Sequence, residues 1–255
     1  MNMTFNRTIA SARAKEHATG KSLLVSRRTI LGLPLLAAPA LLTGCTAETL
    51  LSAGFNQDTA SQPPGSQQAV GTVAAALGNG NVVVAASPAG EANDQWVLIQ
   101  HPSFNDVTSI QGRFSAFRGD GQYMATARLF IPGADGGVPT LQFEGFNQPL
   151  SDLNSFLHLD FLTNGTVRVN DDSSLIFGTY QRGQVFSVQV TFNISASAAT
   201  ATITLLGAAS GSLDVAIPSY FLNQARNFGA VRAWMGANST GAFYVDDLSV
   251  IFVIP

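Results

Sequence analysis

Alternation of apolar and polar residues is the main pattern along this chain. In residues 185–194, every second side chain from Phe186 to Ile194 is apolar, while the side chains between them are mostly polar. Successive side chains of a strand point to opposite faces, so this run predicts an antiparallel strand with one buried face. Similar runs predict further strands over residues 81–86, 96–101, 109–117, 122–131, 140–146, 157–161, 166–170, 200–205, 230–235 and 243–253.

Turn residues separate these runs. Gly and Asp occur together at 119–121, Asn and Gly at 164–165, and residues 132–137 are rich in Gly. A helix is expected only near 219–226, after Pro218. Many short strands at near-even spacing are typical of a β-sandwich or barrel. We therefore predict one all-β domain over residues 69–255.

The N-terminal segment has the order of an export signal. Residues 1–25 are polar and mildly basic, and residues 30–42 are largely apolar. This apolar stretch is shorter than the roughly 20 residues that span a bilayer. Between the two parts stands Ser-Arg-Arg-Thr-Ile-Leu, in which Arg27 and Arg28 resemble the pair of a twin-arginine signal. The alternative is a general secretory signal in which two arginines happen to be adjacent.

Residues 42–45, Leu-Thr-Gly-Cys, resemble the lipobox of bacterial lipoproteins. That resemblance implies a signal peptide over residues 1–44, whose partners are the twin-arginine translocase and the lipoprotein-processing machinery. It also implies an acylated Cys45 that anchors the chain to the cell envelope. Thr46 after the cysteine favours the outer membrane in a cell with two membranes. The alternative is a free cysteine, and no internal disulfide can form because the chain has only one cysteine.

Composition changes after residue 44. No lysine remains, and seven arginines stand against fifteen carboxylates, which gives a net charge of about −8. An acidic surface repels phosphate backbones, so we do not expect this chain to bind nucleic acid. Residues 62–68, Gln-Pro-Pro-Gly-Ser-Gln-Gln, suit neither a helix nor a central strand. We therefore expect residues 45–68 to hold the lipidated N-terminus, a short flexible tether and a candidate first strand.

Several segments resemble the concanavalin A-like lectin and glucanase superfamily, with laminin-G-like jelly rolls as the nearest type. They are residues 53–58 with Pro63-Pro64-Gly65, residues 178–184 with the strand that follows, residues 200–206, and residues 241–250. The resemblance covers most of residues 53–255 and implies a two-sheet antiparallel jelly-roll sandwich. Two features depart from it: no tryptophan follows the opening Pro-Gly, and the Glu-x-Asp-x-x-Glu motif of many glucanases is missing. Unrelated functions share this fold, so it leaves function open.

One set of polar positions is a candidate ligand site. A sugar needs groups that both donate and accept hydrogen bonds, together with an apolar wall for its ring. The strands expected between 122 and 162, with one tryptophan from a later strand, offer such a mixture on their polar faces. The alternative is an ordinary solvated sheet face. The candidate residues are Arg128, Glu144, His158, Asp160 and Trp234.

Carboxylates in two places make a structural Ca²⁺ a candidate cofactor, because Ca²⁺ takes six to eight oxygen ligands. One place is Asp171 with Asp172, for which a hairpin turn is the alternative. The other is Asp246 with Asp247 in the last strand, close to the expected position of Asp58, for which a bulge is the alternative. The resemblance supports the second place, because such jelly rolls often hold an ion near their first and last strands.

Three functions from different classes are consistent with these features. The first is an envelope-anchored lipoprotein that binds glycans or polysaccharide. The second is a structural or adhesive envelope protein without a small ligand. The third is a polysaccharide-degrading enzyme, for which Glu144 and Asp160 would have to supply two carboxylates about 5 to 10 Å apart. We expect a binding protein rather than an enzyme.

Overall fold

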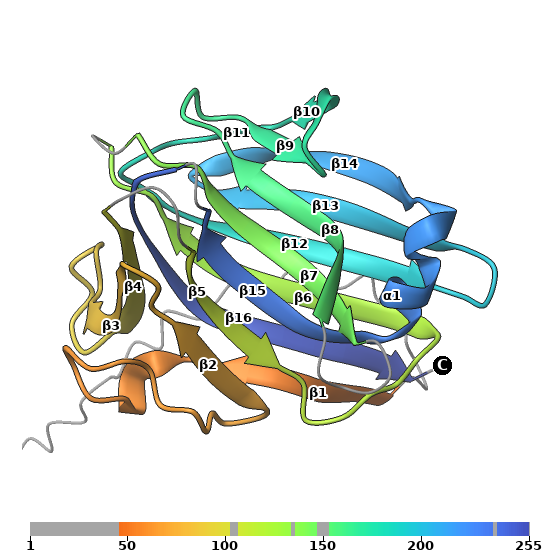
Figure 1. Cartoon of the computed structure of the whole chain (residues 1–255), viewed down its shortest axis with the longest axis horizontal. Helices are drawn as coiled ribbons and strands as arrows, with labels where there is room; N and C mark the ends of the chain where they lie inside the picture. Colours follow the sequence, from red (N-terminus) through yellow and green to blue (C-terminus); the bar gives the residue numbers. More distant parts are fainter. Residues whose placement is uncertain (1–45, 103–106, 134–135, 147–152, 237–238, 255) are drawn as a thin grey trace, which may run out of the picture. The chain divides into compact units, whose positions relative to one another are not determined.

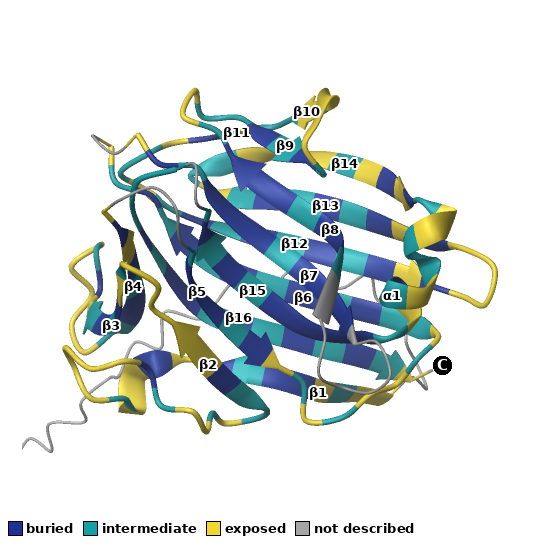
Figure 2. Cartoon of the chain, in the orientation of Figure 1, coloured by how far each residue is buried: buried dark blue, intermediate teal, exposed yellow. Residues whose placement is uncertain are grey.

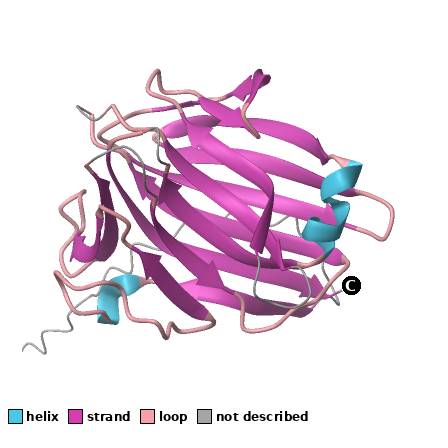
Figure 3. Ribbon diagram, viewed as in Figure 1, coloured by secondary structure: helices cyan, strands magenta, loops and turns pink. Residues whose placement is uncertain are grey.

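A computed structural model describes residues 46–254, except 103–106, 134–135, 147–152 and 237–238. Arg27, Arg28 and Cys45 therefore lie outside the described residues. The chain divides into two units, 1–43 and 44–255, and the description below concerns the second unit. Two antiparallel sheets form the two layers of this unit (Figure 1, Figure 3).

The larger sheet, which we call sheet A, has nine strands in the order β11-β14-β13-β12-β6-β16-β4-β3, with β1 also paired to β16. The long strand β16 pairs with β6 on one side, and with β4 and then β1 on the other. The strands are β1 (Thr46–Ala53), β3 (Asn81–Ala86), β4 (Gln95–His101), β6 (Gly121–Phe130), β11 (Thr179–Tyr180), β12 (Val185–Ile194), β13 (Ala199–Gly207), β14 (Ala209–Ile217) and β16 (Gly241–Ile254).

The smaller sheet, sheet B, has seven strands in the order β10-β9-β8-β7-β15-β5-β2. They are β2 (Thr72–Ala76), β5 (Thr108–Arg113), β7 (Pro139–Phe146), β8 (Leu153–Phe161), β9 (Val167–Val169), β10 (Asp172–Phe177) and β15 (Phe228–Met235). The described helical turns are η1 (Phe55–Gln57), η2 (Ser219–Phe221) and α1 (Leu222–Arg226). Among the described residues, no helix is long and apolar enough to cross a bilayer.

Aromatic side chains from both sheets meet between them. The ring centroid of Phe192 in β12 lies 5.1 Å from those of Phe143 in β7 and Phe228 in β15. Edge-to-face pairs of this kind add about 0.5–1.5 kcal/mol each beyond the burial of their area. Buried and half-buried residues alternate along the strands, as Figure 2 shows. The inward-facing members of this alternation form the hydrophobic core.

The segment expected as a tether belongs to the sandwich. β1 pairs antiparallel with the end of β16, from Thr46 opposite Ile254 to Ala53 opposite Leu248. Phe55 is fully buried in the core. Apolar side chains in β1 and η1 attach this segment, so the boundary at residue 69 places the start of the sandwich too late. The first strand, which the resemblance places at residues 53–58, lies earlier, because β1 ends at Ala53 and residues 55–57 form η1.

The expected all-β, two-sheet antiparallel sandwich is confirmed. β12 begins and ends at the expected residues, and η2 with α1 covers the expected helix at 219–226. The alternation of apolar and polar residues did not predict four of the strands, which are β2, β10, β11 and β14. β14 lies at the side of sheet A, and five of its nine residues are exposed. Such a strand lacks the regular apolar alternation that a half-buried strand shows.

Candidate functional site

The outer face of sheet B is the face turned away from sheet A, and it carries rows of polar side chains. One row crosses five strands, because Trp234 lies opposite Ser109 and Thr140, Thr140 opposite Asp160, and Asp160 opposite Arg168. Side chains directly opposite one another on one face have Cβ atoms about 4.5–5.5 Å apart. The register therefore brings Trp234 and Asp160 to the same face, with Thr140 between them.

A second row lies two residues further along each strand. Arg232 of β15 lies opposite Gln111 of β5 and Gln142 of β7, and Gln142 lies opposite His158 of β8. Two amides, a guanidinium and an imidazole are thus neighbours. Amides both donate and accept hydrogen bonds, as sugar hydroxyls require.

Glu144 of β7 lies in a third row, opposite Ala230. Although it is on the outer face, it is only 2% exposed. Its Oε2 accepts a hydrogen bond of 2.6 Å from Gln111, and its Oε1 accepts one of 2.8 Å from Gln142. Burial raises the pKa of Glu144 above its ordinary value, and the hydrogen bond from Gln111 and the charge of Arg232 offset part of this effect.

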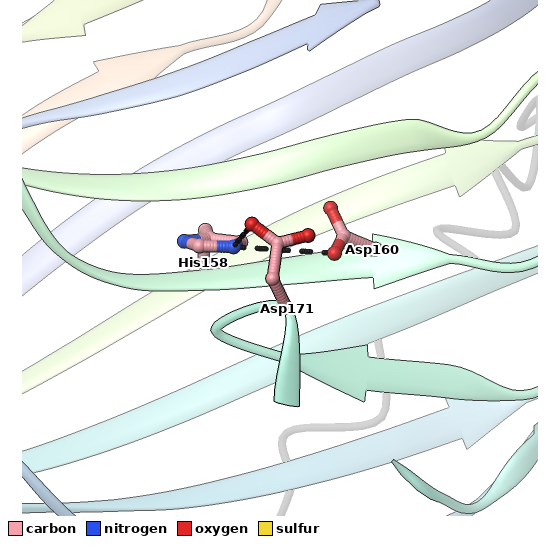
Figure 4. Close-up of side chains that lie close together, drawn as sticks. All are labelled: His158, Asp160 and Asp171. Atoms are coloured by element: carbon pink, nitrogen blue, oxygen red, sulfur yellow. Dashed lines mark hydrogen bonds and ion pairs between the residues drawn. The ribbon is translucent and has the colours of Figure 1, made fainter. Parts of the chain in front are cut away.

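His158, Asp160 and Asp171 form a cluster at the side of the same face (Figure 4). The Nε2 atom of His158 lies 3.1 Å from Asp171 Oδ2 and 3.9 Å from Asp160 Oδ2. Arg168 bridges the two carboxylates, at 3.0 Å from Asp160 and 2.7 Å from Asp171. Asp160 also accepts a 2.7 Å hydrogen bond from Thr140. The single positive charge of Arg168 therefore compensates part of the charge of the two acids.

Trp234 is half-buried on the outer face, as its alternation with apolar neighbours predicts. The guanidinium of Arg232 lies 5.8 Å from its ring centroid. Its indole Nε1 is buried and has no hydrogen-bond partner among the described residues. Trp96 of β4, which its strand position predicts to be in the core, is fully buried but is not part of the core cluster. The guanidinium of Arg128 lies 4.7 Å from its ring centroid, and its Nε1 donates to Asp94 at 2.8 Å.

Arg128 does not belong to this face. β6, which carries it, pairs with β12 and β16 in sheet A, whereas β7, the next strand in sequence, lies in sheet B. Placing Arg128 beside Glu144 was therefore wrong. Alternation along a strand gives the face of a side chain but does not give the sheet to which its strand belongs.

Arg128 instead lies among the acids expected to bind calcium at the last strand. It forms ion pairs with Asp246 at 3.4 Å and with Asp247 at 3.3 Å. Asp58 accepts a hydrogen bond from Gln68. Within the described residues, these carboxylates form no group of three with ligand atoms close to one another. The guanidinium of Arg128 already pairs with Asp246 and Asp247. Calcium binding at these two residues stays a prediction.

Asp171 and Asp172, the other pair expected to bind calcium, have different contacts. Asn170 and Asp171 both have positive φ, at 52° and 58°, and connect β9 to β10 in a tight hairpin turn. Asp172 Oδ1 accepts hydrogen bonds from the backbone N and the hydroxyl of Ser174. Asp171 instead turns toward His158. An imidazole suits a transition ion such as Zn²⁺ better than Ca²⁺, which prefers oxygen, so this donor set does not fit calcium.

A shallow depression of about 220 Å³ lies on the outer face between β2, β5 and β15. It is lined by residues 74–76, which are all alanines, and by Ser109, Gln111, Arg113 and Arg232. These polar residues are not among those that the sequence predicts for a ligand site. Ser109, Gln111 and Arg113 do alternate with Ile110 and Gly112, so the outward pattern of β5 was the signal that could have found them.

The backbone positions of Glu144 and Asp160 lie in different rows of sheet B. Glu144 lies opposite Ser155 and Asp160 lies opposite Thr140, so four residues along β7 separate the two positions. Four residues of a strand span about 13 Å. Catalytic carboxylates of glycosidases lie about 5 to 10 Å apart. This pair therefore gives no support to a polysaccharide-degrading function.

No protein-family profile matches the sequence, and no curated protein matches it. Three solved structures illustrate its likeness in fold. The catalytic domain of the glycoside hydrolase family 131 protein from Coprinopsis cinerea has a TM-score of 0.51 and 12% identity, covering 80% of this chain and 94% of that one. β-Agarase A in complex with oligoagarose has a TM-score of 0.50 and 10% identity, covering 83% and 95%. Peanut lectin has a TM-score of 0.47 and 10% identity, covering 83% and 99%.

The likeness to the two hydrolase structures shows that the described domain shares their jelly-roll sandwich fold. The fold implied by the sequence resemblance is therefore confirmed. At 10 to 12% identity, the likeness concerns the fold alone.

Proposed function

We propose that this chain is an exported, lipid-anchored protein that binds glycans on the outer face of sheet B. The observation that carries the binding proposal is the position of Trp234, which is half-buried on the outer face beside the half-buried amide, guanidinium and imidazole groups of the second row. The indole offers an apolar wall for a sugar ring, and its neighbours offer both donors and acceptors. The depression beside it is open and shallow, which suits a segment of an extended polymer.

The outer face of sheet A offers a different surface. Along β12 and β13, its outward side chains are small and neutral, such as Ser187, Thr191 and Thr202. The tryptophan of sheet A, Trp96 in β4, is fully buried beneath the guanidinium of Arg128, 4.7 Å from its ring centroid, whereas Trp234 of sheet B is only half-buried. This contrast favours the outer face of sheet B as the binding surface.

The fold neighbours support a saccharide as the ligand class. Two of them are a glycoside hydrolase catalytic domain and an agarase that holds oligoagarose. The separation of Glu144 and Asp160 along the sheet favours binding over hydrolysis. Export and the lipid anchor rest on the sequence around Arg27, Arg28 and Cys45. Acyl chains contribute about 0.8 kcal/mol per buried methylene, so two or more chains would hold the protein at the membrane.

A glycan array probed with the full chain in detergent tests the binding proposal. We expect selective binding that Trp234→Ala weakens by about ten-fold or more, because truncation of an anchoring aromatic residue costs upward of about 1 kcal/mol. Tyr220→Ala is the matched control, because Tyr220 is 73% exposed and lies in η2, outside sheet B. Absence of binding across the array, or equal binding by wild type and Trp234→Ala, would refute the proposal.

A further inference from the structure

The arginines of this acidic domain differ in their partners. Four of them form ion pairs with carboxylates: Arg118, Arg128, Arg168 and Arg226. Arg113 and Arg232, by contrast, form no ion pair with any carboxylate of the described residues. Unpaired guanidinium groups are unexpected where seven arginines stand against fifteen acids after residue 44.

Both of these arginines line the depression between β2, β5 and β15. Arg232 lies opposite Gln111, and Arg113 lies two residues further along β5, so the two guanidinium groups occupy neighbouring positions on one face. Ala74 and Ala76 of β2 lie opposite Gln111 and Ser109. The small side chains of these alanines leave the space in front of the arginines open.

The nearest acid, Glu144, interacts electrostatically with both arginines but forms no ion pair with either of them. Both oxygens of Glu144 accept hydrogen bonds from amides, one from Gln111 and one from Gln142. Glu144 is buried under these amides, and burial raises its pKa, whereas an exposed acid would be free to pair with an arginine. One carboxylate shared by Arg113 and Arg232 also leaves the site with a net positive charge.

Neutral groups orient the two guanidinium groups. Arg113 donates from Nε to Gln111 Oε1 at 2.7 Å, and Arg232 donates from Nη2 to Ser109 Oγ at 3.1 Å. Within the described residues, their other N–H groups form no hydrogen bond. A guanidinium presents N–H groups in a planar fork that matches two oxygens of a carboxylate or sulfate group.

We propose that this depression binds the carboxylate or sulfate group of an acidic polysaccharide, with Arg113 and Arg232 as the anion ligands. The inference rests on the proposed glycan-binding function and names the substrate class for the same face. Arg232 also lies against Trp234, so a charged group on the arginines would place the adjoining sugar ring toward the indole. The overall negative charge of the domain disfavours polyanions elsewhere on its surface.

Calorimetric titration of the full chain in detergent with matched polymers tests this inference. One pair is polygalacturonate and its methyl ester, and the other is a sulfated carrageenan and its desulfated form. We expect the acidic member of at least one pair to bind about ten-fold or more tightly than its neutral partner, with affinity that falls as salt rises. Arg113→Gln and Arg232→Gln should each remove this preference, so that the acidic and neutral members of a pair bind with similar affinity.

Arg226→Gln is the charge-matched control, because Arg226 at the end of α1 pairs with Asp120 and does not line the depression. An equal loss in this control would mean non-specific attraction and would overturn the inference. Equal binding of neutral and acidic partners would also overturn it, while leaving glycan binding intact. Binding of none of the four polymers would count against the proposed function as well. Inorganic sulfate that binds as tightly as the polymers would show a site for free oxyanions instead.

Discussion

The Oδ2 atom of Asp246 lies 3.4 Å from Nη1 of Arg128 on sheet A. The same guanidinium also pairs with Glu91, Asp94 and Asp247. Asp246 is 1% exposed, and its Oδ1 has no hydrogen-bond partner among the described residues. Burial and the charge of Asp247 therefore outweigh the attraction of Arg128 and raise the pKa of Asp246 to about 7.

This relationship predicts a pH-dependent stability. A carboxyl group with a raised pKa in the folded state stabilises the fold while it is neutral, and this contribution is lost as the pH rises through about 7. The free energy of unfolding should fall by on the order of 2 to 4 kcal/mol between about pH 4 and pH 8 on account of Asp246. Asp246→Asn should remove most of this fall, as measured by denaturant unfolding at pH 4, 6 and 8.

Asp214→Asn, at an exposed position of β14, is the control for the loss of one carboxylate. It should leave the wild-type pH dependence in place. If Asp246→Asn shows the same decrease in stability as the wild type, Asp246 is ionised in the folded protein across this range.

The core predicts a large difference between the two faces of β12. Phe192→Ala should lower the free energy of unfolding by about 3 to 5 kcal/mol, because it removes a buried ring that contacts Phe143 and Phe228. Gln189→Ala, on the outer face of the same strand, should change it by under about 0.5 kcal/mol. Denaturant titration of both variants measures the difference, and equal effects would contradict the assignment of faces.

Much of the fold could be predicted from residues in single strands. The alternation from Phe186 to Ile194 gives β12, because one face of this strand meets the core. β2 escaped prediction because its sequence is Thr-Val-Ala-Ala-Ala, in which only Val73 is buried. The pairing of β1 with β16 could not be predicted in this way. The Pro-Pro-Gly after β1 indicates a loop, but a loop does not show whether the strand before it belongs to a sheet.

The candidate site could be predicted only in part, since it depends on strand order. Glu144, His158, Asp160 and Trp234 meet on one face because β7, β8 and β15 are neighbours in sheet B. Arg128 lies apart from them because β6 belongs to sheet A and β7 to sheet B. The pattern of residues within a strand does not show to which sheet the strand belongs. The bend of Asp171 toward His158 likewise depends on a tertiary contact.

The export proposal makes a direct prediction. Arg27→Lys with Arg28→Lys should leave precursor in the cytoplasm, because lysine lacks the planar guanidinium that twin-arginine recognition requires. Cell fractionation with detection of the uncleaved chain measures this outcome. Normal export of the double variant would assign the signal to the general secretory route.

The anchor proposal has its own test. Cys45→Ala should abolish incorporation of labelled palmitate and leave the signal peptide uncleaved, because the thiol that would carry the lipid is absent. Cys45→Ser is a closely matched second variant, since a hydroxyl replaces the thiol. Labelling that persists in either variant would show that Cys45 is not the lipidation site.

The central claim is that glycans bind the outer face of sheet B, and the two tryptophans of the chain give a direct measurement of it. Each indole N–H gives one cross-peak in a ¹H–¹⁵N spectrum, and Trp234→Phe assigns them. Titration with the glycan that binds most tightly in the array should shift the Trp234 peak and leave the Trp96 peak in place, because Trp96 is buried in sheet A. A shift of Trp96 alone, or saturation of binding with neither peak moving, would contradict the claim.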